Sequence, residues 1–221
     1  MSSKEERNTN EQLKKMTALA MMSAIAFLVV AVIRIPVILF LKYEPKDVII
    51  MLGGFIFGPT SAFVISLVSS VVEMITVSET GILGCIMNII SSCSFACTAA
   101  FIYKRKKNLV SAISGMTIGY VFMVICMLAW NYLITPIYMG YPREAVAELL
   151  IPVFLPFNLV KGALNIGITM LLYKPIIITL RRLNLIPKRD TAKPEMISKK
   201  VIIGAILLLI VAAIALLILS K

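Results

Sequence analysis

Few residues in this sequence could do chemistry, and the most unusual of them lie inside apolar stretches. Glu73 and Lys161 are ionisable side chains within long hydrophobic segments, and four asparagines lie in comparable segments: Asn88, Asn131, Asn158 and Asn165. Asn158, Lys161 and Asn165 recur at i, i+3 and i+7, so a helix presents them as one stripe. Ionisable groups at membrane depth are costly and usually face a cavity or a partner.

These side chains predict a cavity for a neutral, flat solute with polar edges. Amides donate and accept hydrogen bonds along the edge of a heterocycle, and Glu73 can accept protons from hydroxyl groups. A simpler alternative is that the amides only bridge neighbouring helices, as asparagine commonly does in membranes. The number of polar groups, all placed toward the outer half of the bilayer, favours the cavity.

Composition indicates the solvent that surrounds these residues. Hydrophobic residues make up 60% of the 221 and charged residues only 15%, and the mean hydropathy is +0.97. Soluble domains are nearer half apolar and a quarter charged, so we expect a membrane protein embedded in a lipid bilayer. The net charge of +11 lies in loops and tails, where it orients membrane proteins. No basic run is interleaved with aromatic residues, so nucleic acid is not an expected partner.

The sequence offers no catalytic or metal-binding motif. Histidine is absent, which removes the commonest general base and metal ligand. The four cysteines lie in apolar segments without partners for a metal site, and a phosphate-binding G-x-x-x-x-G-K-[ST] loop is missing. We therefore expect no enzyme activity, no metal and no resident cofactor. ATP hydrolysis behind any uphill transport must come from a partner.

Hydrophobic runs divide the chain into six spans and an additional one. The six cover about residues 16–33, 48–57, 61–77, 82–103, 109–133 and 149–172. A helix needs about 20 apolar residues to cross a bilayer core, so the predicted fold class is all-α and polytopic. The expected organisation is a cytoplasmic tail at 1–15, a six-span substrate-binding domain at 16–185, a polar cytoplasmic linker at 186–200 and a seventh, C-terminal transmembrane helix at 201–219.

Lysine and arginine gather on one side of this topology. Most of the 22 basic residues lie in the N-terminal tail, at 104–107 and at 174–200. Such residues mark cytoplasmic loops. We therefore expect a multi-pass protein of the cell membrane with its N-terminus in the cytoplasm.

Residues 34–47 form a mixed segment in which prolines and charges interrupt apolar residues. It predicts an interfacial loop or a short re-entrant piece rather than a span. Phe40, Leu41 and Tyr43 would allow this segment to cover the cavity from outside. A loop that lies passively on the interface explains the same residues equally well.

The first span carries small residues four positions apart, Ala20 and Ala24. Such spacing lets another helix approach closely. From the residues alone, packing within the chain is the simpler explanation.

Three blocks of the sequence together resemble a known family: FLKYEPKDVIIMLGGFIFGP at 40–59, VVEMITVSETGILGCIMNIISS at 71–92 and FNLVKGALN at 157–165. They are similar to the riboflavin-specific S component (RibU type) of energy-coupling factor (ECF) transporters. The resemblance extends through nearly all of residues 10–185.

The resemblance implies a six-helix membrane subunit that binds riboflavin near the outer face and delivers it inward. Its implied partners are a transmembrane coupling subunit, which Ala20 and Ala24 would meet, and two cytoplasmic ATPases. Residues 36–43 would act as a lid over the flavin, with Leu41 and Tyr43 among them. The positions that match flavin-binding residues are Glu73, Asn131, Asn158 and Lys161; Asn88 and Asn165 join them on geometry alone.

The seventh span departs from the six-span family core and leaves the contact of the C-terminal side with the partner open. Two related functions also remain open: an S component for another vitamin and a stand-alone secondary transporter. The short chain without a convincing inverted repeat counts against the second. An intramembrane enzyme is disfavoured by the missing catalytic motifs.

Overall fold

The structure, a computed structural model, describes residues 3–182 and 199–219. Within these residues, six helices are long and apolar enough to cross a membrane: Thr9–Val32, Pro59–Thr76, Gly81–Lys106, Leu109–Met139, Arg143–Ile176 and Val201–Leu219. They confirm the predicted all-helical, polytopic membrane fold. The predicted linker at 186–200 lies almost entirely outside the described residues.

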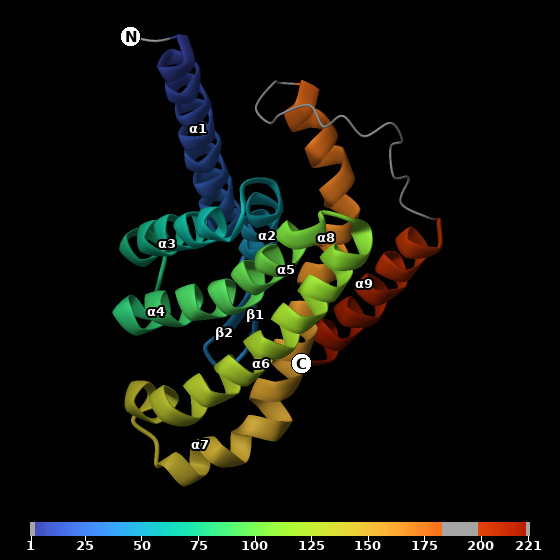
Figure 1. The fold of residues 1–221 in the computed structure, drawn as a ribbon. Helices are drawn as coiled ribbons and strands as arrows, with labels where there is room; N and C mark the ends of the chain where they lie inside the picture. Colours follow the sequence, from blue (N-terminus) through green and yellow to red (C-terminus); the bar gives the residue numbers. More distant parts are fainter. Residues whose placement is uncertain (1–2, 183–198, 220–221) are drawn as a thin grey trace.

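The first helix, α1 (Ser3–Val32), projects from the rest of the molecule at its N-terminal end (Figure 1). It extends through the polar segment that the sequence analysis treats as a tail, because residues 1–15 contain no proline or glycine to end it. Only 28% of the most apolar window of its span is buried. Most of this helix is therefore free to meet lipid or another protein.

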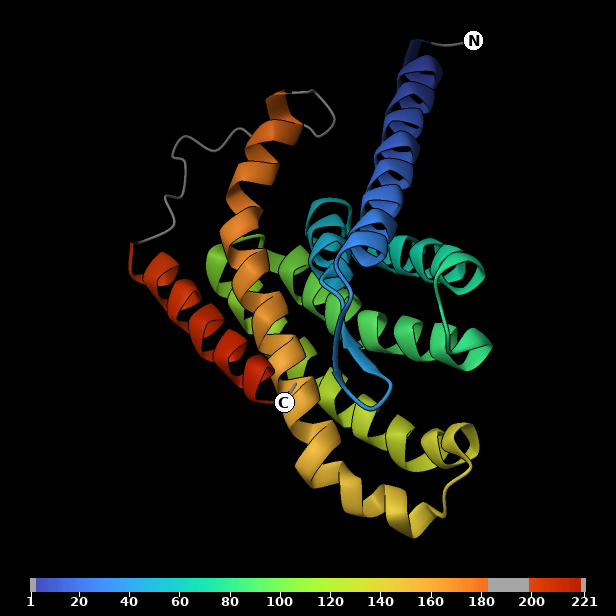
Figure 2. The same cartoon turned by 180° about the vertical axis from the view of Figure 1, so that it is seen from behind.

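A β-hairpin follows α1 and folds back against the bundle (Figure 2). Its antiparallel strands are β1 (Ile35–Ile38) and β2 (Leu41–Tyr43). The prediction that this segment is not a span is confirmed, whereas its form is a hairpin rather than an irregular loop or a re-entrant piece. The turn holds Leu39 at a left-handed φ of 53°, where hairpins normally place glycine or asparagine. No sequence signal therefore marks the turn.

The next helix, α2 (Lys46–Phe57), has 12 residues and rises only about 18 Å. It is too short to cross a membrane alone, which corrects the prediction of a span at 48–57. Most of α2 is buried, and its Gly54 lets two helices approach. A Cβ at Gly54 would lie 2.9 Å from the Cβ of Ala100 and 3.1 Å from that of Ala62. Gly58, at a φ of 99°, then turns the chain into α3 (Pro59–Thr76).

Three segments form one continuous helix with a π-helical turn at its centre: α4 (Gly81–Ser92), η1 (Cys93–Cys97) and α5 (Thr98–Lys106). This helix packs against α6 (Leu109–Met139). Gly115 and Gly119 of α6 face the backbone of Ala99 and Phe95, and a Cβ on Gly115 would lie 2.7 Å from the Ala99 carbonyl oxygen. Glycine is required here by the close approach of two backbones.

The long loop predicted between the fifth and sixth spans is mostly helical. The α6 helix continues through Pro136 to Met139, and α7 (Arg143–Leu149) begins three residues after Gly140, which turns at a φ of 67°. A second π-helical turn, η2 (Leu150–Phe154), leads into α8 (Leu155–Arg182). The last helix, α9 (Lys199–Leu219), occupies the position predicted for a C-terminal span and lies alongside α8 (Figure 1).

Candidate functional site

A cavity lies beneath the hairpin, between α4, α6 and α8. Its wall combines three cations, two carboxylates, three amides, two aliphatic hydroxyls and a set of aromatic and apolar side chains: Arg34, Lys42, Lys161, Glu44, Glu79, Asn88, Asn131, Asn158, Thr80, Ser91, Phe40, Leu41, Met87, Met127, Tyr138 and Phe157. Five of the predicted site residues are among them: Leu41, Asn88, Asn131, Asn158 and Lys161. The structure thus brings together side chains from four separate elements.

Two of the asparagines are oriented by their own helices. Asn131 donates one amide hydrogen to the carbonyl of Met127 at 2.7 Å, and its Oδ1 accepts from Thr135 at 2.9 Å. Asn158 donates in the same way to the carbonyl of Phe154 at 2.7 Å. A carboxamide has two donor hydrogens, so each side chain retains one for a solute in the cavity.

Lys161 is the most buried of the three cations that line the cavity, and its contacts with other side chains of the protein are long. Its Nζ lies 3.5 Å from Asp47 Oδ2 and 3.5 Å from Ser91 Oγ. An ammonium group carries three donor hydrogens. Lys161 can therefore donate to a solute without breaking a short hydrogen bond.

Glu73, a predicted cavity residue, does not line the cavity. Its buried carboxylate forms an ion pair with Lys46 and accepts a hydrogen bond from Asn88 at 3.1 Å. Arg34 lies 3.5 Å from the same carboxylate. Glu73 thus holds Asn88, which does face the cavity, and ties α3 to α2 and to the end of α1.

Tyr43 and Asn165 also lie behind the cavity wall. The Tyr43 hydroxyl donates to Asn165 Oδ1 at 3.2 Å, and Asn165 Nδ2 donates to Asp47 Oδ2 at 3.2 Å. Burial, with the nearby charge of Asp47 as a smaller contribution, raises the pKa of Tyr43. The tyrosine therefore stays a neutral donor that fixes the hairpin to α8.

The charged residues around the hairpin were not among the predicted site residues, because their charges were interpreted only as interruptions of an apolar segment. Arg34 Nε lies 2.8 Å from Glu44 Oε1, and Lys46 Nζ lies 3.3 Å from Glu44 Oε2. Counted with Lys161, this network holds three cations against the three carboxylates of Glu44, Asp47 and Glu73. The available signal was the charge-rich run KYEPKD beside apolar residues. The balance of charge suits a neutral solute.

A smaller, almost wholly apolar pocket adjoins the cavity. The two share Phe40, Thr80, Met87 and Tyr138, and the smaller one adds Leu83, Gly84, Trp130, Ile134 and Thr135. One side of the combined site is therefore polar and the other is aromatic and aliphatic. Such a site fits an amphiphilic, flat solute.

Metal-binding geometry is missing from the part of the chain that the structure describes. No group of three or more His, Cys, Asp or Glu residues is placed to hold an ion there. The four cysteines are free thiols.

Neither Ala20 nor Ala24 lines the cavity, and both lie on an exposed face of α1. Neighbouring apolar side chains on the same helix are exposed as well, among them Met21, Ile25 and Leu28. Packing within the chain therefore does not explain the two alanines.

A helical membrane bundle with a covered polar cavity is the architecture of a solute-binding membrane protein. Residues 14–173 match the family described as "ECF transporter, substrate-specific component". The chain therefore belongs to the S components of ECF transporters. These are multi-pass subunits of the cell membrane that bind a vitamin and act with an energising module, and they are not enzymes.

Two known proteins agree with this assignment. The chain is 30% identical over 182 residues to a protein of Staphylococcus aureus (strain TCH60) named "Riboflavin transporter RibU", a match that covers 78% of this chain and 95% of the relative. It also resembles a structure described under the heading "Structure and mechanism of the S component of a bacterial ECF transporter". The TM-score is 0.68 at 29% identity, with 77% of this chain and 99% of the other covered.

Proposed function

We propose that this S component binds riboflavin in the cavity beneath the hairpin. The observation that carries the proposal is the pairing of an amide-rich, charge-balanced cavity with an apolar pocket beside it. Riboflavin has the matching form, since it joins a flat, largely apolar ring system to a polar ring edge and a hydroxylated chain. The relative named as a riboflavin transporter supports the same substrate.

The proposed pose assigns a role to each side of the site. The dimethylbenzene end of the ring lies in the apolar pocket near Trp130 and Tyr138. Asn131, Asn158 and Lys161 then donate to the polar ring edge and to the hydroxyl chain. Phe40 and Leu41 of the hairpin close the site above the ligand.

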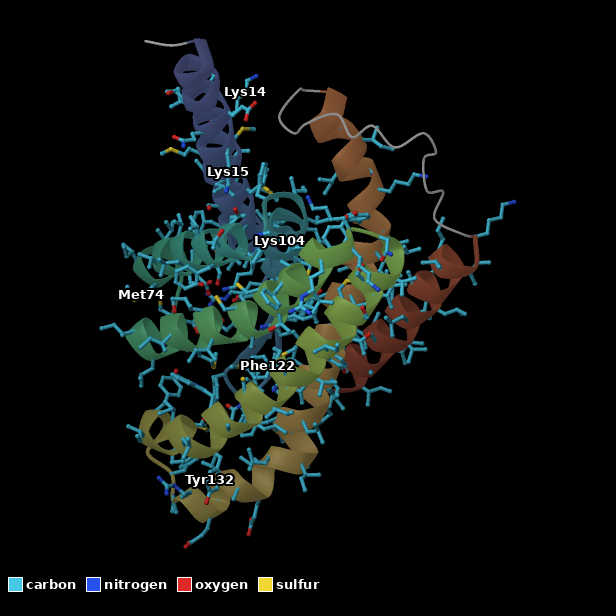
Figure 3. All side chains as sticks on the ribbon, in the orientation of Figure 1. Lys14, Lys15, Met74, Lys104, Phe122 and Tyr132 are labelled. Carbon is cyan, nitrogen blue, oxygen red and sulfur yellow. The ribbon has the colours of Figure 1, made fainter. Side chains whose placement is uncertain are left out.

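We further propose that the N-terminus is cytoplasmic and that the cavity opens toward the outer face. Lys14 and Lys15 lie toward one end of the molecule and Tyr132 toward the other (Figure 3). Basic residues mark the cytoplasmic side, whereas tyrosine and tryptophan gather at membrane interfaces. The exposed alanine face of α1 is the proposed contact with a transmembrane coupling subunit, which two ATPases drive.

Titration of the purified protein with riboflavin tests the substrate. Flavin fluorescence should be quenched to saturation at one ligand per chain, and thiamine, biotin or folate should not compete. Tighter binding of one of those vitamins would identify that vitamin, and not riboflavin, as the substrate of this S component. Proteoliposomes that contain this subunit alone should not accumulate riboflavin against a gradient; such accumulation would favour a stand-alone transporter.

A further inference from the structure

The hairpin over the cavity needs support from outside itself. Its strands have four and three residues, and Leu39 in the turn adopts a left-handed conformation that is unfavourable for leucine. An isolated two-stranded hairpin is marginally stable at best. The closed position of the hairpin therefore depends on the elements that pack against it.

Polar contacts hold one side of the hairpin. Lys42 pairs with Glu79, which lies in the turn between α3 and α4, at 2.6 Å. Arg34 pairs with Glu44 at 2.8 Å, where β2 ends. The first contact joins the hairpin to the α3–α4 turn, whereas the second closes the base of the hairpin. Arg34 also donates to the carbonyl of Val77 at the end of α3.

The opposite side of the hairpin is apolar and meets the C-terminal helix. Val37 and Tyr43 belong to one cluster of buried side chains together with Ala212 and Leu216 of α9. α9 also contacts β1 directly. The cluster continues through Leu164 of α8, so the hairpin, α8 and α9 share a single core.

α9 is held firmly enough to act as a support. A Cβ on Gly167 of α8 would lie 2.6 Å from Leu209 Cγ and 3.3 Å from the Ala205 carbonyl oxygen, so the two helices approach closely. Yet α9 lies wholly outside residues 14–173, which match the S-component family. It is an addition to the family core that is packed against the cover of the cavity.

We propose that α9 is a brace that holds the hairpin closed and thereby slows exchange of the ligand. Opening the hairpin must separate Val37 from the shared core and expose apolar surface, which the brace makes less favourable. The effect on ligand exchange rests on the proposed function, whereas the effect on the hairpin does not.

Four full-length variants in two matched pairs test the brace. Leu216→Ala and Ala212→Phe change buried positions of α9, which are 8% and 4% exposed. Leu207→Ala and Ala213→Phe make the same changes at exposed positions of the same helix. Hydrogen–deuterium exchange of ligand-free protein then reports the opening of residues 35–43.

Each buried variant should accelerate exchange in residues 35–43 by about tenfold, because it removes or distorts packing that opposes local opening. The exposed variants should leave it unchanged. Riboflavin release from the buried variants should quicken by a similar factor. If wild-type protein binds no riboflavin, the proposed function fails and hairpin exchange still decides the brace.

Unchanged hairpin exchange in both buried variants would overturn the proposal and leave α9 as a helix that packs on α8 alone. Equal acceleration in the buried and exposed variants would overturn it as well, since that result would indicate general loosening of the bundle.

Discussion

Lys161 occupies the polar side of the cavity with two contacts at 3.5 Å, to Asp47 and to Ser91. Replacement by methionine keeps much of the side-chain volume and removes the donor. We expect Lys161→Met to weaken riboflavin binding about 10- to 100-fold, since a hydrogen bond to a buried polar group is lost. Fluorescence titration measures the change.

Lys104→Met, at an exposed position, is the matched control and should bind as the wild type does. Equal riboflavin affinity of the wild type and both variants would show that the ligand does not reach Lys161. The cavity would then be assigned wrongly.

Glu73 is expected to act on folding more than on ligand affinity. Glu73→Gln removes the carboxylate that pairs with buried Lys46, and breaking a buried ion pair typically lowers the free energy of unfolding by about 3–5 kcal/mol. The nearby Glu44 should moderate this loss. Thermal unfolding should therefore shift to clearly lower temperature, whereas Glu148→Gln, which is exposed, should have no effect.

The opposite pattern would restore the role that the sequence resemblance assigns to Glu73. An unchanged melting temperature with lost riboflavin binding would place this carboxylate against the ligand.

The types and spacing of the polar residues predicted much of the cavity. Asn158 and Lys161 share one stripe of α8, and both line the cavity as the helical period requires. Asn165 lies on the same stripe but is two turns away from Asn158 and bonds Asp47 instead. Periodicity gives the face of a helix, whereas the depth along it depends on what packs against that face.

The hairpin contributes Phe40, Leu41 and Lys42 to the wall of the cavity. Lys42 bonds Glu79 across the mouth. This hydrogen bond, and then the charge of Lys42, hold the pKa of Glu79 below its usual value of 4.5. The pair is therefore intact at pH values above 4.5 and is lost as the pH falls through the lowered pKa.

Riboflavin release should accordingly be equally fast at pH 7 and pH 5 and should accelerate only at lower pH. At pH 7, Glu79→Gln should accelerate release by about two- to threefold, the modest effect of an exposed ion pair. Glu144→Gln is the control. Stopped-flow flavin fluorescence measures both rates, and acceleration already at pH 5 in wild-type protein would contradict this role of the pair.

The elements differ in how well the sequence could predict them. Long apolar runs indicated α1, α3, the continuous helix α4–η1–α5, α6, α8 and α9, because the bilayer sets a minimum length. The hairpin escaped prediction because Leu39 replaces the usual turn residue, and α2 was counted as a span because its composition is apolar although its length is 12 residues. The helical continuation to Met139 was hidden by Pro136, which α6 accommodates.

At the scale of the molecule, substitutions on the exposed face of α1 should impair energised transport without affecting ligand binding. Its exposed alanines, Ala20 and Ala24, lie apart from the cavity and permit close approach of another helix. We expect Ala20→Trp or Ala24→Trp to leave riboflavin affinity unchanged and to abolish uptake in cells that contain the energising module. Ala145→Trp, at an exposed position of α7, should preserve uptake.

Loss of binding in the α1 variants would instead mean that these alanines support the fold of the subunit. Normal uptake would place the coupling contact on another face.

The visible absorption spectrum of the protein purified from cells shows whether this S component carries riboflavin. The proposed site should retain a yellow flavin at close to one molecule per chain, or take it up to that ratio when riboflavin is added, and this flavin should fluoresce once denaturation releases it. A colourless preparation that binds no added riboflavin would contradict the claim.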